Sequence, residues 1–290
     1  MKINNIQNFS SKTHIISNEI IRNLIGCKTG ERIASIASIA SELNCGHGLV
    51  QTIFNDLQDN NSIKIHKQGH LGSYLEDIDD IKLLSYLGKN ELLGTLPLLY
   101  SDKYRELSNN IYATFNNKPA IYLAYIRGAI SRIELLIRGH FDFTIVSHKT
   151  AQSRIQTHND IEIVHNFAPN SYASGHGVVF TSDRTKLEDG MVVGIDNESL
   201  DHIEIVNDFC SENSVKLEPV YYYDLISKMK NKELDAVIWS IDGLSNFTNK
   251  YIPIETAPEY RQATLIISKE KQYIKRLFLK LLQEKKDGTN

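Results

Sequence analysis

Two amide side chains one helical turn apart are the first residues whose type and spacing point to chemistry. Gln51 and Asn55 lie in the stretch 47–57, where apolar residues recur at helical spacing. Side-chain amides can form paired hydrogen bonds with the edge of adenine in the major groove of DNA. We therefore expect a helix that reads DNA with its outward residues, namely His47, Gly48, Gln51, Thr52 and Asn55.

A second short helix is expected directly before it. The stretch 33–41 repeats Ile-Ala-Ser three times, and its apolar residues recur at helical positions i, i+3, i+4 and i+7, namely Ile36, Ile39, Ala40 and Leu43. Asn44-Cys45-Gly46 then forms a turn. Two short helices joined by a turn of this kind predict a helix-turn-helix.

The flanking segments complete a winged helix-turn-helix. An amphipathic helix is expected over 14–26, and two short strands over 62–75 form a hairpin whose Lys64 and Lys67 would reach phosphates. Residues 1–70 carry a net charge of +2, from seven Lys/Arg and five Asp/Glu. So few cations indicate modest affinity per protomer, and we therefore expect a homodimer on a two-fold site in double-stranded DNA. An all-α structural or protein-binding module remains the alternative.

Residues 32–75 resemble the DNA-binding domain of GntR-type regulators. In that family an apolar-Ala-x-x-Leu segment, a Gly-Val-Ser turn and an apolar second helix follow at fixed spacing. Gly46 stands where a capping Ser is expected, and Gly caps a helix less firmly. His47 stands where Arg is common, so the resemblance implies DNA binding with one weaker contact.

The rest of the chain contains two similar segments, 91–148 and 191–242. Each predicts strand, helix, strand, helix and closing strand, and the closing parts "RGHFDFTIVS" and "NKELDAVIWS" align residue by residue. Alternating strands and helices predict parallel sheets, here in two lobes of similar build.

The predicted fold class is α/β, with an N-terminal winged helix-turn-helix joined to a two-lobed type II periplasmic-binding-protein-like domain. The expected ranges are a DNA-binding domain at 1–75, a linker at 76–90 and a two-lobed domain at 91–290. Within the latter, lobe one comprises 91–150 and 250–290, and lobe two comprises 151–249.

A ligand site is expected in the crevice between the lobes, where the strands end. Arg127 is the one fixed cation at a strand end, so we expect a small anionic effector, although Arg127 could instead pair with Glu134. Helices that begin after Ser101 and Ser199 would also favour an anion. The predicted ligand-binding residues are Tyr100, Ser101, Asp102, Arg127, Ser147, Asn197, Ser199, Ser240 and Asp242.

Most of the chain resembles one narrower family, the YhfZ-type transcriptional regulators. The matching motifs are "GTLPLLY" at 94–100, "RGA" at 127–129, "FDFTIVS" at 141–147, "VGIDNES" at 193–199 and "LDAVIWS" at 234–240. The resemblance implies a winged helix-turn-helix joined to a solute-binding-like sensor domain. It implies neither an effector nor a target sequence.

Other classes of function lack their signatures. The chain contains no G-x-S-x-G, P-loop, H-E-x-x-H or G-x-G-x-x-G motif, so we expect neither an enzyme nor a cofactor. Its three cysteines and ten histidines show no metal-ligand spacing, so no metal is expected, and His176 between two glycines indicates a tight turn. No apolar run of about 18 residues or signal-like leader is present, which favours the cytoplasm. Two alternatives stay open: a metabolic enzyme on a two-lobed scaffold, and a DNA-binding protein whose second domain only oligomerises.

Overall fold

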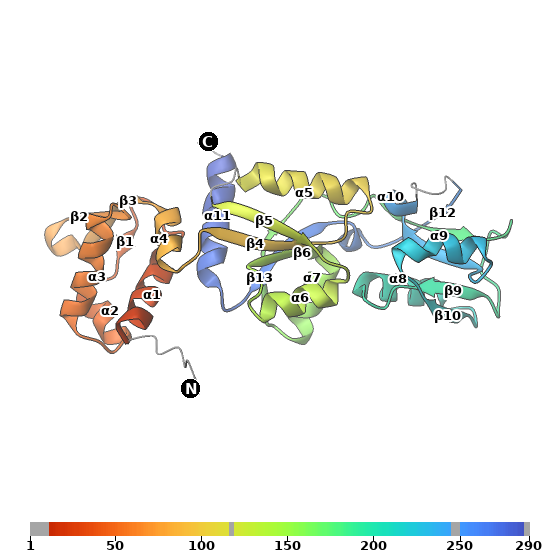
Figure 1. The fold of residues 1–290 in the computed structure, drawn as a ribbon, viewed down its shortest axis with the longest axis horizontal. Helices are drawn as coiled ribbons and strands as arrows, with labels where there is room; N and C mark the ends of the chain where they lie inside the picture. Colours follow the sequence, from red (N-terminus) through yellow and green to blue (C-terminus); the bar gives the residue numbers. More distant parts are fainter. Residues whose placement is uncertain (1–11, 116–118, 245–249, 287–290) are drawn as a thin grey trace, which may run out of the picture. The chain divides into compact units, whose positions relative to one another are not determined.

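The structure is a computed structural model that describes residues 12–115, 119–244 and 250–286 (Figure 1). Residues 1–11, which belong to the stretch expected not to be a signal sequence, lie outside this range. The chain divides into two compact units, one comprising the chain up to Glu91 together with the segment from Gln272 onward, and the other comprising Leu92–Lys271. We call these the DNA unit and the sensor unit.

The DNA unit contains the expected winged helix-turn-helix. Its helices are α1 (Lys12–Leu24), α2 (Ile36–Glu42) and α3 (His47–Asp59), and its antiparallel sheet has the order β1 (Arg32–Ile33), β3 (Ser73–Ile78), β2 (Ile63–Lys67), with the short η1 (Gly69–Leu71) between β2 and β3. Helices α1 and α3 contact one another, and the apolar stripes of both are buried, with Ile20, Ile21, Val50, Phe54 and Leu57 among the buried residues.

The turn between α2 and α3 lies where the sequence predicted it, at Asn44-Cys45-Gly46. Ser35 caps α2 by accepting a hydrogen bond from the Ser38 amide at 3.1 Å, whereas Gly46 begins α3 with extended backbone and no side-chain cap. Asn44 adopts a left-handed conformation with φ of 47°, which Asn tolerates better than most residues.

The expected linker at 76–90 is wrong, because this segment is folded into the DNA unit. Strand β3 continues to Ile78, and α4 (Asp80–Tyr86) follows, capped by Asp79, whose carboxylate accepts hydrogen bonds from two backbone amides. Leu83 and Leu84 on α4 are fully buried. The acidic stretch resembles a linker in sequence, but Glu76 and Asp77 lie on β3, and Asp79 and Asp80 form the cap and first turn of α4.

The C-terminal helix α11 (Gln272–Lys286) was expected in lobe one but belongs to the DNA unit. Its Arg276 Nε donates a hydrogen bond to the Ile25 carbonyl at 3.2 Å. Lys280 of α11 pairs with Asp80 of α4 at 2.6 Å, and Asp80 also accepts a hydrogen bond from the Gly26 amide at 2.8 Å. These contacts join α11 to the end of α1, which the local pattern of α11 does not reveal.

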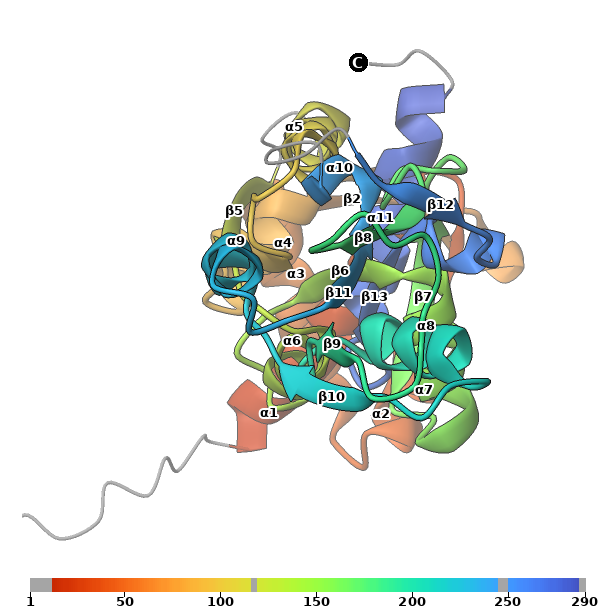
Figure 2. The ribbon, with the colours of Figure 1, turned by 90° about the vertical axis from the view of Figure 1, so that its right-hand side faces the viewer.

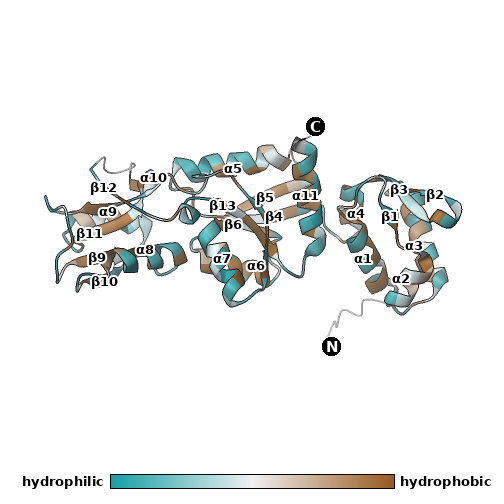
Figure 3. Ribbon diagram, turned by 180° about the vertical axis from the view of Figure 1, so that it is seen from behind, coloured by the Kyte–Doolittle hydropathy of each residue, from teal (hydrophilic) through white to brown (hydrophobic). Residues whose placement is uncertain are grey.

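The sensor unit is built from two five-stranded sheets (Figures 1 and 2). The first lobe has the strand order β5 (Ala120–Tyr125), β4 (Glu91–Leu96), β6 (Phe143–Ser147), β13 (Ala263–Ser268), β7 (Ile161–Asn166), with helices α5 (Asp102–Phe115), α6 (Ala129–Ile137) and α7 (His148–Thr157). The second lobe has the order β10 (Lys216–Pro219), β9 (Val192–Ile195), β11 (Ala236–Ser240), β8 (His176–Phe180), β12 (Ile252–Ile254), with helices α8 (Leu200–Cys210), α9 (Tyr222–Lys230) and α10 (Ile241–Leu244). The central strands β6, β13 and β11 are almost wholly buried and are coloured hydrophobic in Figure 3.

The predicted repeat is confirmed at the level of single hydrogen bonds. In the first lobe the Asp142 carboxylate accepts from the Leu93 amide at 3.1 Å, and the Asp142 amide donates to the Leu93 carbonyl. In the second lobe Asp235 makes the same two bonds with Val192. The aligned Asp residues therefore have the same role in both copies: each joins a closing strand to the first strand of its lobe.

The expected lobe boundaries need correction, because each lobe takes in a strand from beyond its expected range. Strand β7, expected in lobe two, pairs with β13 of the first lobe, and β12, expected in lobe one, pairs with β8 of the second. The chain therefore crosses between the lobes twice, through residues 167–175 and then through 255–262, which include η2 (Pro258–Tyr260).

Candidate functional site

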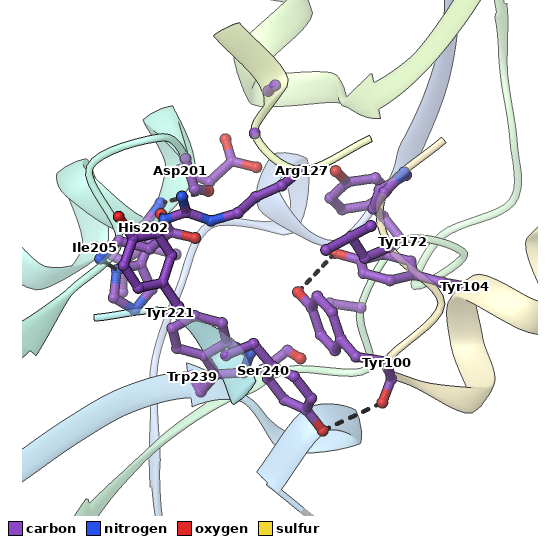
Figure 4. Close-up of a pocket in the computed structure, with 18 of the residues that line it drawn as sticks. Tyr100, Tyr104, Arg127, Tyr172, Asp201, His202, Ile205, Tyr221, Trp239 and Ser240 are labelled. Atoms are coloured by element: carbon purple, nitrogen blue, oxygen red, sulfur yellow. Dashed lines mark hydrogen bonds and ion pairs between the residues drawn. The ribbon is translucent and has the colours of Figure 1, made fainter. Parts of the chain in front are cut away.

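A cavity of about 320 Å³ lies between the two lobes of the sensor unit (Figure 4). This volume is at the small end of the range for small-molecule sites. Both lobes and both crossing segments contribute to its wall, and aromatic side chains form much of it: Tyr100, Tyr104, Tyr172, Tyr221, Tyr222, Tyr223, Trp239 and Tyr260.

Aromatic contacts join the lobes at one side of the cavity. The ring of Tyr100 stacks on that of Tyr222 with centroids 4.2 Å apart, and the Tyr222 hydroxyl donates to the Tyr100 carbonyl at 3.3 Å. Trp239 lies next to both rings and is buried. Burial raises the pKa of Tyr100, and also that of Tyr104, so both phenols stay neutral hydrogen-bond donors at ordinary pH.

Arg127 reaches across the crevice to the second lobe. Its guanidinium pairs with the Asp196 carboxylate at 2.5 Å and lies over the Tyr221 ring, 4.1 Å from the centroid. The expected alternative, a pair between Arg127 and Glu134, is wrong, because Glu134 pairs with Arg154. Arg127 and Tyr221 occupy equivalent positions of the repeat. In each lobe the amide of the preceding residue donates a hydrogen bond to the carbonyl at the end of the first strand. Two equivalent turns thus meet face to face.

Asp201 forms a second connection between the lobes. The hydroxyls of Ser147 and Thr150 in the first lobe both donate to its Oδ1 atom, each at 2.8 Å. Burial raises the pKa of Asp201 to about 6, although the two hydroxyl donors act in the opposite direction. The carboxylate is therefore held ionised near neutral pH at some cost in solvation.

Replacing Asp201 should change how stability depends on pH. The folded pKa of about 6 exceeds the ordinary Asp value of 3.8, so the folded state binds more protons between these values. The contribution to stability is thus present below about pH 4 and lost as pH rises through about 6. Asp201→Asn, which keeps an oxygen acceptor for both hydroxyls, should gain on the order of 2 kcal/mol over the wild type from pH 4 to 7, measured by urea unfolding. The exposed Asp102→Asn is the matched control, and wild-type and Asp201→Asn profiles that run parallel would contradict the expectation.

Four of the nine predicted ligand-binding residues line the cavity: Tyr100, Arg127, Ser199 and Ser240. Ser199 is also the N-cap of α8 and accepts from the His202 amide, while Ser240 ends β11. These positions follow from the strand-end rule, which places the end of each parallel strand at the crevice.

The other five do not line the cavity. Ser101 caps α5, and Asp102 is exposed and pairs with Arg105. Asn197 is exposed, and Asp242 accepts hydrogen bonds from the Ser174 amide and hydroxyl, each at 2.7 Å. Ser147 does not line the cavity itself, but its hydroxyl donates a hydrogen bond to Asp201, which does. Residues beside a strand end thus often cap the next helix instead of facing the crevice.

Sequence reasoning did not identify several residues of the wall, among them Asp196, Asp201 and His202. His202 Nδ1 accepts from the Asp196 amide at 2.9 Å, its Nε2 donates to the Ile238 carbonyl at 2.6 Å, and burial lowers the pKa of its ring. A neutral His202 therefore positions Asp196. Asp201 and His202 lie in the first turn of the helix expected after Ser199. Their place next to that predicted helix start is the sequence feature from which they could have been predicted.

His176 also lines the cavity, although the sequence indicated only a turn. It begins β8, and burial lowers its pKa to about 4, so the ring is neutral at ordinary pH. The missed tyrosines of the crossing segments, Tyr172 and Tyr260, had no local signal, because irregular segments carry no periodicity.

In the DNA unit, the residues predicted to read bases lie on the solvent side of α3. His47, Gly48, Thr52 and Asn55 are exposed and Gln51 is partly exposed, while the opposite face is buried. Gln51 Nε2 donates to Asn55 Oδ1 at 2.8 Å, so the two amides are already aligned.

The wing carries the two predicted phosphate contacts on exposed side chains. Lys67 ends β2, and Lys64 pairs with Glu76 of the neighbouring strand at 2.5 Å, a hydrogen bond that raises the pKa of Lys64. An exposed pair of this kind is weak and opens readily. Both lysines are therefore accessible to a phosphate.

Both parts of this architecture match known protein families. Residues 79–286 match the YhfZ C-terminal domain, and residues 28–75 match a helix-turn-helix domain. The chain belongs to the YhfZ family. It is 29% identical over 261 residues to the uncharacterized protein YhfZ of Escherichia coli K12, covering 88% of this chain and 85% of that one.

Solved structures agree with the fold. The crystal structure of YhfZ from Shigella flexneri has a TM-score of 0.52 and 24% identity, covering 72% of this chain and 95% of that chain. An ancestral arginine-binding protein bound to arginine has a TM-score of 0.51 and 14% identity, covering 69% and 95%. The predicted family and fold class are thereby confirmed: a YhfZ-type chain that joins a helix-turn-helix to a periplasmic-binding-protein-like domain.

Membrane-spanning and metal-binding features are absent from the described residues. None of their helices is long and apolar enough to cross a bilayer, and no three of their His, Cys, Asp or Glu side chains gather as metal ligands would. Cys27, Cys45 and Cys210 are free thiols.

Proposed function

We propose that this protein is a ligand-responsive DNA-binding transcriptional regulator. The observation that carries the proposal is that one chain joins a helix-turn-helix with an exposed polar recognition face to two lobes that meet around an aromatic cavity. The first part is suited to reading DNA and the second to enclosing a small molecule.

On DNA, α3 would enter the major groove, with Gln51 and Asn55 placed against base edges. Lys67 and Lys64 on the wing would contact phosphates. With so few cations, one unit would bind weakly, so we propose a homodimer that occupies two half-sites.

The effector would occupy the cavity and stabilise the contacts that join the lobes, which include the Arg127–Asp196 pair and the hydroxyl bonds to Asp201. The chain passes between the two units twice, once after Glu91 and once before Gln272. A change in the first lobe can therefore reach the DNA unit through both α4 and α11. By linkage, effector and DNA must alter each other's affinity by the same factor.

The proposal is tested by selecting a random pool of duplex DNA with the full-length protein, with and without a metabolite mixture. We expect enrichment of a two-fold-symmetric site and a change in its yield when the mixture is present. An enzyme that merely shares this scaffold would enrich no sequence and would consume a bound metabolite. That result would overturn the proposal.

Within the same selection, Gln51→Ala should lose about 1–3 kcal/mol of discrimination at one base position per half-site, while non-specific binding remains. Gln58→Ala is the matched control, because this glutamine lies toward the other end of α3 and donates to the Phe54 carbonyl of its own helix. Equal base preferences for both variants and the wild type would mean that another face of α3 reads DNA.

A further inference from the structure

Charged groups around the cavity are separated by sign between the lobes. The first lobe contributes Arg127 and Arg132, and the second contributes Asp196, Asp201 and Asp224. Arg127 and Asp196 already pair with one another. Arg132 and Asp201, in contrast, form no direct ion pair with a described residue.

Arg132 is a buried guanidinium on α6 with only 2% of its surface exposed. Its Nη1 donates to the Ile126 carbonyl at 2.9 Å, and its Nη2 donates to the Tyr172 hydroxyl at 3.3 Å and to the Ile145 carbonyl at 3.4 Å. Its Nε has no acceptor within the described part of the chain. No described carboxylate pairs with it, although a buried charge is costly unless it is matched.

Asp201 is the opposite case on the other lobe. Its described contacts within hydrogen-bond distance are the two hydroxyls of Ser147 and Thr150, and no Lys or Arg of the described chain pairs with it. It lines the same cavity as Arg132. A cation of the first lobe and a carboxylate of the second thus line one small cavity (Figure 4 labels Asp201). They attract one another through space, but neither is in direct contact with an opposite charge among the described residues.

We infer that the effector is a small zwitterion, with its anionic group on the first-lobe wall near Arg127 and Arg132 and its cationic group on the second-lobe wall near Asp201. This inference rests on the proposed function and names the class of ligand. It refines the anionic effector expected from Arg127 alone. A molecule with only negative charge would sit against the carboxylates of the second lobe, and a neutral one would leave Arg132 and Asp201 to interact only through space, with neither in contact with an opposite charge.

The surroundings of each group fit this assignment. Because Arg132 donates to the Tyr172 oxygen, the Tyr172 hydrogen remains to be donated elsewhere. The cavity is also lined by Gly128 and Ala129 at the beginning of the nine-residue helix α6, an end of a helix that favours an anion and that the Glu198 carboxylate already approaches through Ser131. On the opposite wall, Asp201 itself is the carboxylate that would receive a cationic group.

The test measures the thermal midpoint and the dissociation constant of the full-length protein with defined probes. Carboxylate zwitterions are represented by the twenty free amino acids, and phosphorus-containing ones by 2-aminoethylphosphonate and O-phosphoethanolamine. Each probe is paired with its analogue lacking the amine and its analogue lacking the acid. We expect at least one zwitterion to bind, with both of its singly charged analogues at least tenfold weaker.

Asp201→Asn tests the cationic end of the same probe. We expect it to weaken the zwitterion at least tenfold while affinity for the analogue lacking the amine stays within twofold. A purely structural role for Asp201 would weaken both probes alike. Asp102→Asn, which removes an exposed carboxylate outside the cavity, should change neither affinity.

Binding of a singly charged analogue as tightly as its zwitterion, or no zwitterion bound in the panel, would overturn the ligand class. The DNA selection is read separately, so a selected site with no zwitterion bound leaves the regulator intact. Conversely, a bound zwitterion that leaves affinity for the selected site unchanged would support the ligand class and count against the regulatory role.

Discussion

Gly128→Ala is expected to destabilise the contact between the two lobes and to expose Trp239, the only tryptophan of the chain. Gly128 adopts a φ of 78°, and a Cβ there would lie 2.8 Å from the backbone oxygen of Glu198 in the second lobe. With a ψ of 129° this conformation lies outside the left-handed helical region and costs about 1–3 kcal/mol for a residue with a Cβ, and the steric overlap adds about 1–3 kcal/mol. Opening of the crevice relieves the overlap, so the lobes should separate.

Gly139→Ala supplies the matched control for this effect. Gly139 has a φ of 81° at the other end of the same helix, and a Cβ added there would have nothing within 4 Å. Both variants should lose stability from backbone strain, but only Gly128→Ala should shift Trp239 emission to longer wavelength and increase the radius of gyration in solution scattering. The same emission from both variants would mean that the lobes do not depend on this close approach.

Gly26→Ala should detach the C-terminal helix from the DNA unit. Gly26 has a φ of 79°, and an added Cβ would lie 2.5 Å from the backbone carbon of Arg276 and 2.6 Å from the Leu277 amide nitrogen. Backbone atoms of a helix cannot turn aside as a side chain can. We expect a total loss of about 3 kcal/mol, combining left-handed strain with overlap.

The measurement is hydrogen exchange of the α11 amides in the full-length protein. Protection of α11 should fall in Gly26→Ala, because the hydrogen bonds from the Gly26 amide to Asp80 and from Arg276 to Ile25 depend on the same approach. Gly30→Ala is the control, since Gly30 has a φ of 86° with nothing within 4 Å. If the two variants exchange α11 amides equally fast, the packing of α11 against this turn contributes little.

Local periodicity was sufficient for the elements that repeat a pattern. The stripes of α2 and α3 predicted the helix-turn-helix, including the beginning of α3 at His47, because a buried helix face requires apolar residues every three or four positions. The repeat in the sensor unit was also visible, since Asp142 and Asp235 perform the same backbone capping in both lobes.

Segment assignment between the lobes needed the tertiary structure. Strands β7 and β12 have ordinary strand sequences, and only antiparallel pairing with β13 and β8 decides which sheet each one joins. Likewise α11 is an amphipathic helix by sequence, but its apolar face does not say which unit it covers.

The residues of the cavity also fall into those that the sequence predicts and those that only the tertiary structure brings there. By itself the sequence determined that strand ends would supply Tyr100, Arg127, Ser199 and Ser240, because parallel strands all end at one edge of a sheet. Only the tertiary structure decided that Arg127 meets Asp196 rather than Glu134, and that Asp201 faces Ser147. Such pairs join residues more than fifty positions apart, and hydrogen bonds or charges at that separation leave no periodic trace along the chain.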